Sequence, residues 1–368
     1  MNIPFFALDR QYQTIRTDIL NAYDKVMSSG KVIRGINTQM LEEEIAARCD
    51  RQFAIAVNSG TSALMGAIIS LHCQSKNILC PAESFVATAN AIYSTSNNPV
   101  IVDSDYSGLL NIKKLTKSKL ENASALLYVN LYGNCLDYDN LRVMLELYGI
   151  SNLPIIEDAC QSFGSSYKGI PSGKLGTISC LSFDPTKNLN NYGSGGMILT
   201  DDIHVAEYMR NFRSNGTEVY SHRLEYGINV QMSEMDAAGL LVKLKHFDKW
   251  QARRTQIANH YNSEFSKIFA LDIPTQTLDS VCNWHKYVLR ASHVDRNKLK
   301  EHLEKNGIET RIHYDMSLRQ HQMNIDKYDT NTISHKNCQE KLSLPIYPEL
   351  KDEEVEYIIK VVKEYYGK

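Results

Sequence analysis

The sequence predicts an α/β fold, in which a large domain with a mostly parallel seven-stranded sheet precedes a smaller C-terminal α+β domain. Between residues 50 and 200, short apolar and β-branched runs alternate with segments of helix length, which is the pattern of β-α units. A long stretch of helical periodicity at 233–269 then separates this region from a second one of mixed pattern. With 368 residues, 43% of them hydrophobic, the chain has enough apolar side chains for a large core.

Seven short apolar runs are predicted to form the strands of the large sheet. They lie at 53–57, 77–80, 100–103, 125–129, 154–157, 178–183 and 196–200. Helical periodicity at 62–71, 84–94 and 138–148 supplies the crossovers that parallel strands require.

The helical stretch at 233–269 is predicted to be one helix that links the two domains. Ser233 can cap its start, and the pair Arg253 and Arg254 is expected on its solvated face. The two domains are expected at 1–245 and 246–368.

In the smaller domain, alternation at 285–292 predicts a strand, and the pattern at 296–306 predicts a helix that Gly307 stops. Strand character resumes at 308–312, and the polar stretch 326–337 is expected to be an exposed connection.

The last helix is the best defined, because apolar residues recur on one face at helical spacing. These residues are Val355, Ile358, Ile359 and Val362. The side chains left for water are Glu354, Lys360 and Lys363.

Charge and composition exclude several classes of partner. Forty Lys and Arg residues against 42 Asp and Glu give a net charge of −2, which offers no general attraction to nucleic acid or to an anionic membrane. The N-terminal residues do not resemble a secretory signal, and the longest apolar stretch, 63–71, is too short to span a bilayer. The eight cysteines include no C-x-x-C pair, so we expect reduced core thiols, no metal site and a soluble cytoplasmic protein.

The first chemical signal is the segment 58–64, where a strand ends in a small-residue turn that opens into a helix. Free N–H groups at a helix start favour an anion, and Gly60 would let a phosphate approach the main chain. Ser59 or Thr61 as an ordinary helix cap is the alternative. The segment matches neither the Walker loop nor the three-glycine dinucleotide turn.

The second signal is the segment 155–164, a buried strand that delivers carboxylates at its carboxyl end, where open α/β sheets bind ligands. Asp158 could hold a cationic ring nitrogen there, and Gln161 could donate to a neighbouring oxygen. The alternative is that Asp158 only caps a following helix.

The third signal is Lys187, isolated between the predicted strand at 178–183 and the glycine-rich turn at 192–197. Against an apolar wall, a lysine amine suits Schiff-base chemistry with an aldehyde. The alternative is an ordinary surface lysine.

Together these signals are what pyridoxal 5′-phosphate requires from a protein, and in this order they resemble the DegT/StrS-type sugar aminotransferases of fold type I. The resemblance runs nearly end to end. It covers the segments 29–35, 58–64, 81–88, 157–164, 182–189, 227–232 and 344–348.

The resemblance implies roles for individual residues. Lys187 would form the Schiff base with the cofactor, Asp158 would pair with its pyridinium nitrogen, and Gln161 would contact its phenolic oxygen. Phe85 would lie against one face of the ring. The residues implied around the phosphate are Gly60, Thr61, Ser62 and Ser182.

Further implied roles concern the partner subunit and the substrate. Asn229 would reach the phosphate of the neighbouring subunit's cofactor, so that a homodimer shares its active sites. The substrate would contact Ile33, Arg34, His313 and Tyr314.

Three departures from the family pattern leave the cofactor residues intact and the sugar open. Asp184 stands where many relatives have an aromatic residue, and Ser194 where an acidic residue or asparagine is common. The loop at 311–315 resembles the family's substrate-side loop but lacks the proline that often follows its tyrosine. Lys187 itself favours transamination, because the related dehydratases have histidine there.

The resemblance implies an aminotransferase that converts a nucleotide-linked keto-deoxysugar to an amino sugar, with L-glutamate as donor. The product would serve surface polysaccharide, such as lipopolysaccharide O-antigen or capsule, or glycoside synthesis. An aminotransferase for a small phosphorylated ketone or cyclitol is the alternative substrate class. A dinucleotide-dependent oxidoreductase would need a G-x-G-x-x-G turn, which the sequence lacks. A catalytically silent binding or regulatory protein is the third alternative, and the intact Lys187, Asp158 and Gln161 argue against it.

Overall fold

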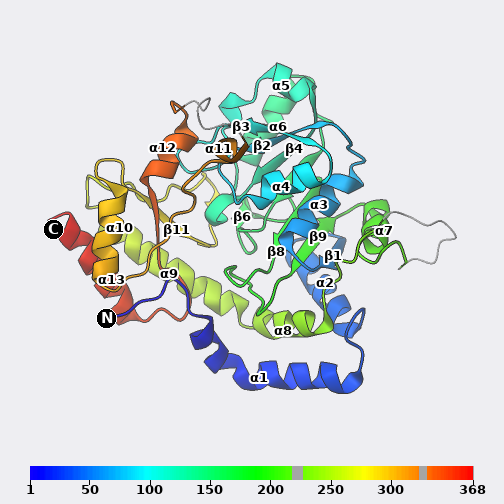
Figure 1. The fold of residues 1–368 in the computed structure, drawn as a ribbon, viewed down its shortest axis with the longest axis horizontal. Coiled ribbons are helices and arrows are strands. Elements are labelled where there is room, and N and C mark those ends of the chain that lie inside the picture. Colours follow the sequence, from blue (N-terminus) through cyan, green and yellow to red (C-terminus); the bar gives the residue numbers. More distant parts are fainter. Residues whose placement is uncertain (218–226, 323–329, 368) are drawn as a thin grey trace.

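The computed structural model describes residues 1–217, 227–322 and 330–367 (Figure 1). Its centre is a seven-stranded sheet in the order β1-β9-β8-β5-β4-β2-β3. All neighbouring strands pair in parallel except β9, which is antiparallel to β1 and to β8. The strands are β1 Phe53–Val57, β2 Asn77–Pro81, β3 Asn98–Val102, β4 Ala123–Val129, β5 Ile155–Asp158, β8 Ile178–Ser182 and β9 Gly196–Thr200. The predicted α/β fold and mostly parallel sheet are confirmed.

Helices cover both faces of this sheet, as parallel strands require. The helix α3 lies against β8 and β9, while α2 packs on β1 and on α8, which in turn lies beside α1 along one side of the molecule (Figure 1). The helices of this part are α1 Leu8–Ser29, α2 Ile36–Arg48, α3 Gly60–Ser70, α4 Ala87–Ser94, α5 Lys117–Glu121, α6 Tyr138–Leu147, α7 Ile203–Phe212 and α8 Glu234–Leu244, with short 3-10 turns at Ile112–Lys114 and Leu131–Gly133.

The rest of the chain builds a second core around the antiparallel pair of β11 and β12. The helices α9, α10 and α13 pack together there, and α13 lies beside the N-terminal residues (Figure 1). A small three-stranded sheet joins β10 to β6 and β7. The elements are β6 Ser166–Tyr167, β7 Ile170–Pro171, α9 Phe247–Phe265, β10 Ser280–Val281, β11 Tyr287–Arg290, α10 Arg296–Lys305, α11 Leu318–Gln322, α12 Ile333–Glu340, β12 Lys341–Leu344 and α13 Asp352–Tyr365.

The prediction of one helix over 233–269 is wrong, because α8 and α9 are separate. Leu240 and Leu244 of α8 belong to the core beside the large sheet, together with Phe247 at the start of α9, whereas the later apolar residues of α9, from Ile257 to Phe265, belong to the second core. The continuous periodicity therefore conceals a break between two helices.

The predicted cap is confirmed, since Ser233 Oγ accepts a hydrogen bond from the backbone N–H of Asp236 at 3.1 Å. The division into domains 1–245 and 246–368 stays a prediction.

Two charged side chains predicted to face water are buried. Arg254 donates to the carbonyl oxygens of Trp284 at 3.2 Å and Ile346 at 2.8 Å. Glu354 accepts two hydrogen bonds from the guanidinium of Arg10, at 2.7 and 2.8 Å. Both predictions fail because the partners come from distant parts of the chain, which a helical pattern does not reveal.

Two further predictions for the smaller domain are wrong. The segment 308–312 forms only single bridges, from Ile308 to Ile3 and from Arg311 to Ser343, instead of a strand. The described part of 326–337 is not an exposed connection, because α12 begins at Ile333; the residues 326–329 lie outside the described ranges. None of the helices in the described ranges has the length and apolar character that crossing a bilayer requires.

Candidate active site

A cavity of 370 Å³ lies where β1, β5 and β8 end. Because these strands run in the same direction, their carboxyl ends meet at one edge of the sheet. The predicted site residues that line this cavity are Gly60, Thr61, Phe85, Asp158, Gln161, Ser182, Lys187, His313 and Tyr314.

The start of α3 forms one end of the cavity. Ser59 Oγ caps the helix by accepting from the N–H of Ser62 at 3.1 Å, so the alternative interpretation as a cap is correct for Ser59. An anion site remains compatible with this cap, because the first N–H groups of a helix have no acceptors within it. A Cβ atom on Gly60 would lie 2.7 Å from Ser182 Cβ. Glycine therefore lets the helix start and the end of β8 meet closely enough to share one ligand.

Asp158 lies buried at the end of β5 and is held by two donors. The N–H of Cys160 and the hydroxyl of Thr88 each donate to its carboxylate at 3.1 Å. Burial raises the pKa of Asp158, and the hydrogen bonds from Cys160 and Thr88 and the nearby Lys187 oppose that rise. Residues 160–164 form turns, so the helix that Asp158 would cap in the alternative interpretation is absent. The carboxylate is positioned for a cationic ligand in the cavity.

Lys187 is partly buried and lines the cavity from a tight turn between β8 and β9. The Asp184 carboxylate accepts from the N–H and hydroxyl of Thr186, at 2.9 and 2.6 Å, and the Asp184 carbonyl accepts from the N–H of Lys187 at 2.9 Å. The departure at Asp184 therefore has a structural role, because this side chain organises the turn that carries the lysine.

Gln161 has a fixed amide orientation. Its Oε1 accepts from the N–H of Tyr132 at 2.9 Å, and its Nε2 donates to the hydroxyl of Tyr314 at 3.2 Å. The N–H donors of the amide thus face the cavity beside Tyr314. Phe85, with 55% of its surface exposed, has its ring centroid 6.3 Å from that of Tyr314, so an aromatic wall stands next to the polar groups.

Four predicted residues lie outside the cavity. The hydroxyl of Ser62 donates to Asn58 Oδ1 at 2.7 Å within the chain. The other three are exposed at the surface: Ile33, Arg34 and Asn229. Their predicted contacts with cofactor, partner or substrate stay predictions.

Arg34 and Asn229 nevertheless belong to one surface network. Gln231 Oε1 accepts from Arg34 Nε at 2.6 Å, and Gln231 Nε2 donates to Asn229 Oδ1 at 3.3 Å. Residues from two distant segments therefore present their polar groups on the same outer face.

Several lining residues were missed in the sequence analysis. Thr88 lies within a segment that the family resemblance covers, which was the available signal. His285, Lys286 and Arg311 come from the C-terminal part of the chain and line the cavity. Arg311 begins the loop that resembles the family's substrate-side loop. Local sequence patterns gave no signal for His285 and Lys286, because only the tertiary fold brings them beside Lys187.

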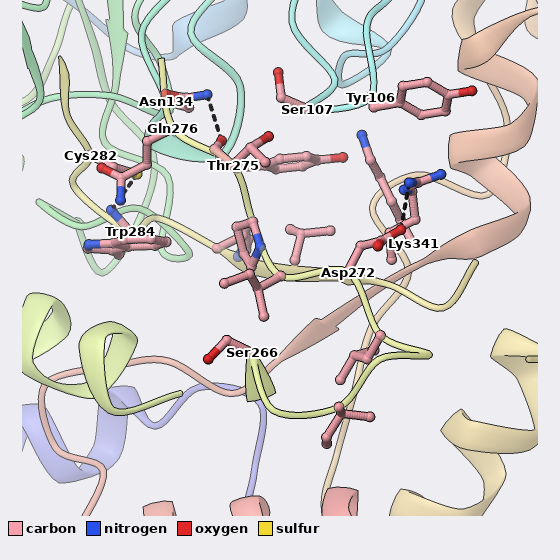
Figure 2. Close-up of a pocket in the computed structure, with 18 of the residues that line it drawn as sticks. Tyr106, Ser107, Asn134, Ser266, Asp272, Thr275, Gln276, Cys282, Trp284 and Lys341 are labelled. Atoms are coloured by element: carbon pink, nitrogen blue, oxygen red, sulfur yellow. Dashed lines mark hydrogen bonds and ion pairs between the residues drawn. The ribbon is translucent and has the colours of Figure 1, made fainter. Parts of the chain in front are cut away.

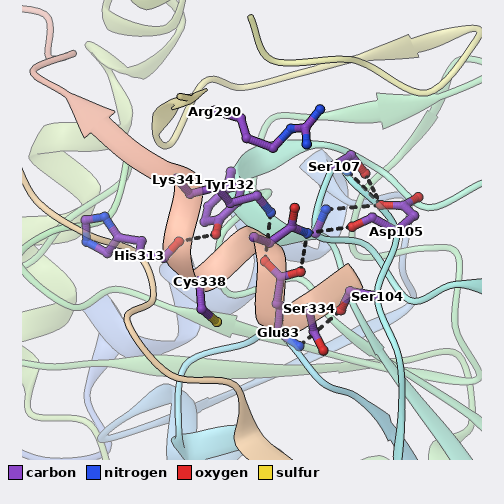
Figure 3. Close-up of polar contacts among 12 residues, drawn as sticks. Glu83, Ser104, Asp105, Ser107, Tyr132, Arg290, His313, Ser334, Cys338 and Lys341 are labelled. Carbon is purple, nitrogen blue, oxygen red and sulfur yellow. Dashed lines mark hydrogen bonds and ion pairs between the residues drawn. The ribbon is translucent and has the colours of Figure 1, made fainter. Parts of the chain in front are cut away.

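A buried ion pair connects the two parts of the chain next to the cavity (Figure 3). Glu83 Oε2 lies 2.7 Å from Lys341 Nζ. Only 1% of the Glu83 side chain and 4% of the Lys341 side chain are exposed. Asn337 also donates to Glu83. Because Glu83 precedes Phe85 by two residues, the ion pair fixes the start of β12 to the segment that carries Phe85. Near it, the Tyr132 hydroxyl donates to the carbonyl oxygen of His313.

Replacing Lys341 by alanine is expected to lower the free energy of unfolding by about 3–5 kcal/mol, because Glu83 would keep a buried charge without its partner. Denaturant unfolding measures this. Lys168→Ala serves as the control, since Lys168 forms an exposed pair with Asp139, and only a much smaller change is expected there. Equal losses in the two variants would contradict the role of the buried pair.

The fold and the site define a pyridoxal-phosphate-dependent transferase of fold type I. A helix start for a phosphate, a buried aspartate, an oriented amide donor and a lysine surround one cavity, which is the donor set that this cofactor fits. The chain belongs to the DegT/DnrJ/EryC1/StrS aminotransferase family, which matches residues 13–363. It is a pyridoxal-phosphate-dependent aminotransferase.

Two curated relatives and one solved structure illustrate the similarity. The erythromycin biosynthesis sensory transduction protein EryC1 of Saccharopolyspora erythraea is 32% identical over 99% of this chain and 99% of its own. The dTDP-3-amino-3,4,6-trideoxy-alpha-D-glucose transaminase of Streptomyces venezuelae is 31% identical, with coverage of 99% and 96%. The crystal structure of S. venezuelae DesV with a ketimine intermediate is 31% identical, covers 100% of this chain and 99% of its own, and has a TM-score of 0.92.

Proposed function

We propose that this protein is a cytoplasmic homodimer that transfers the amino group of L-glutamate to the keto carbon of a nucleotide-linked deoxysugar. Its product would enter the assembly of surface polysaccharides, such as lipopolysaccharide O-antigen or capsule, or of glycosides. The observation that carries the proposal is the single cavity that joins Lys187, Asp158 and Gln161, in a chain similar over nearly its whole length to a nucleotide-sugar transaminase.

Pyridoxal phosphate, when bound, supplies the electron sink for the reaction. In the proposed mechanism Lys187 would hold the cofactor and would then remove and return the proton at the reacting carbon. Asp158 would keep a proton on the ring nitrogen, which would strengthen that sink. The Gln161 amide would donate to the phenolic oxygen, and stacking by Phe85 would contribute about 0.5–1.5 kcal/mol beyond area burial.

Two half-reactions test the proposal separately by absorbance. L-Glutamate alone should convert the pyridoxal form of the purified enzyme to the pyridoxamine form. A panel of nucleotide-linked keto-deoxysugars should then include one that restores the pyridoxal form. Restoration only by a small phosphorylated ketone or a keto-cyclitol would favour the alternative substrate class. Failure of every amino donor and acceptor would favour a regulatory role, in line with the name of the EryC1 relative.

The proposed dimer shares its sites through Asn229. In one chain this side chain is exposed and outside the cavity, beside Arg34 on a polar surface, which supports a position facing a partner. The cofactor phosphate would then receive donors from both subunits, and neither chain alone would form a complete site.

Mixing Lys187→Ala chains with Asn229→Ala chains is expected to restore part of the activity that each variant lacks alone. If Asn229 serves the partner's site, one site of the heterodimer carries both changes and the other carries neither. Activity assays after subunit exchange measure the recovery. Asn229→Ala alone must first be shown to be strongly impaired, and an absence of recovery in verified heterodimers would refute the shared site.

A further inference from the structure

Two cationic side chains from the C-terminal part of the chain, which both line the active-site cavity, lie near the same aromatic ring. Lys286 Nζ lies 5.1 Å from the ring centroid of Phe5, and Arg311 Cζ lies 5.3 Å from the same centroid. Both residues line the cavity that contains Lys187. Arg311 also lowers the pKa of Lys286, so the two cationic groups are near enough to interact at this part of the cavity.

The carboxylates around this pair are too few to neutralise it. Glu309 pairs with Arg311 at 2.9 Å, and it also accepts from the N–H of Phe5 at 2.9 Å. Within the described residues, no carboxylate lies within ion-pair distance of Lys286, and among the largest influences on its pKa the charge of Asp184 is the one that raises it. Glu309 thus pairs with Arg311 alone, and Lys286 has no carboxylate partner among the described residues.

Burial and cationic neighbours set the charge state of this wall. Burial and the charges of Lys187, Arg254 and Arg311 hold the pKa of Lys286 well below its ordinary value. Burial and the charges of Lys286, Arg311 and Lys187 lower the pKa of His313 to about 3, so His313 is neutral at pH 7. An anion bound here would be attracted by Arg311, and it would raise the pKa of Lys286 and so favour its protonated form.

The buried side chain of His285 is an independent observation that points to a ligand at this part of the cavity. It is 4% exposed and lines the cavity directly before Lys286. Its Nδ1 atom has no hydrogen-bond partner among the described residues. A buried polar atom without a partner is costly, and a ligand held between His285 and Lys286 would satisfy it.

Lys286 also lines a second cavity of 530 Å³, which extends past Asp272 and Trp284 (Figure 2). The other two cations that line it are neutralised. Arg290 pairs with Asp272 and Glu340, and Lys341 pairs with Glu83. Among these three lining cations of the described chain, Lys286 is therefore the one without an acidic partner.

We propose that Lys286 and Arg311 bind a carboxylate of the amino donor beside Lys187. This inference rests on the proposed function, because it assigns the amino-acid half-reaction to this wall. The proposed binding site of the cofactor phosphate is at another part of the cavity, where α3 starts. A donor carboxylate is separated from the reacting nitrogen by few bonds, whereas the diphosphate of a nucleotide sugar lies beyond the sugar ring. The short distance favours the carboxylate for a site in the same cavity as Lys187.

Binding of glutarate to the cofactor-loaded enzyme tests the proposal without turnover. Glutarate carries two carboxylates and cannot donate an amino group. We expect calorimetry to detect its binding to the wild type and about 10- to 100-fold weaker binding to Lys286→Met, because a hydrogen bond to a charged group is lost. Lys286→Arg should keep most of the affinity, and the surface control Lys168→Met should keep all of it. A thermal unfolding midpoint no lower than that of the wild type verifies that Lys286→Met is folded.

The two half-reactions distinguish the donor from the acceptor as the source of the anion. In Lys286→Met, the apparent affinity for L-glutamate should fall more than that for the keto sugar. Unchanged glutarate binding in the variant, no binding to the wild type, or a loss confined to the keto-sugar half-reaction would each overturn the proposal. Loss of glutarate binding in Lys286→Met would support it even if no nucleotide sugar reacted, a result that would refute only the proposed acceptor.

Discussion

Replacing Lys187 by alanine is expected to abolish transamination while leaving the protein folded. Lys187 carries no structural ion pair among the described residues, and its turn is held by Asp184 and Thr186 through hydrogen bonds that the substitution leaves in place. The loss of the amine removes both the covalent attachment of the cofactor and the proton carrier, so turnover should fall by at least about 10⁴-fold.

Absorbance, turnover and circular dichroism check this result. Lys187→Ala should lose the visible absorption of the covalently held cofactor and keep its circular dichroism spectrum. Lys187→Arg should not restore activity, because a guanidinium stays protonated and does not condense with an aldehyde. Normal turnover in Lys187→Ala would refute the assignment.

Replacing Asp158 by asparagine is expected to reduce turnover by about 10²- to 10⁴-fold at saturating cofactor. In the proposed mechanism the buried carboxylate of Asp158 keeps a proton on the ring nitrogen, and an amide would not hold the proton there. The variant should still bind the cofactor, because the donors at the start of α3 are unchanged.

Turnover as a function of cofactor concentration separates a chemical role from a structural one. Thr88→Val is the matched control, since it removes one of the two hydrogen bonds to the carboxylate but keeps the charge, and a smaller loss is expected. If Asp158→Asn weakens only cofactor affinity and leaves the saturated rate unchanged, the carboxylate has a structural role.

Much of the large domain could be predicted because its strands are local apolar runs. Each of the seven runs coincides with an observed strand to within two residues at its ends. The cavity could be anticipated for a related reason: Asp158 and Ser182 end strands, the turn at Gly60 follows one, and parallel strands bring their carboxyl ends together.

The smaller domain was harder to predict because long-range partners decide the state of its residues. Periodicity indicates which face of a helix is apolar, but it does not show that a distant carbonyl or guanidinium will cover a charged residue. Arg254 and Glu354 were assigned to water for that reason. Lys286 was not predicted as a site residue for the same reason, since Phe5 and Arg311 lie near it only in the folded protein.

The contacts of the N-terminal residues with the second core also constrain the order in which the protein can be completed during translation. Ile3 exchanges backbone hydrogen bonds with Gly307 and Glu309, at 2.8 and 2.9 Å, and Arg10 binds Glu354. Residue 3 is synthesised about 300 residues before these partners, or about 15–60 s at ~5–20 residues per second. Throughout that interval the backbone N–H and carbonyl of Ile3 lack these native partners, so a chaperone that shields nascent N-terminal segments should raise the yield of folded enzyme.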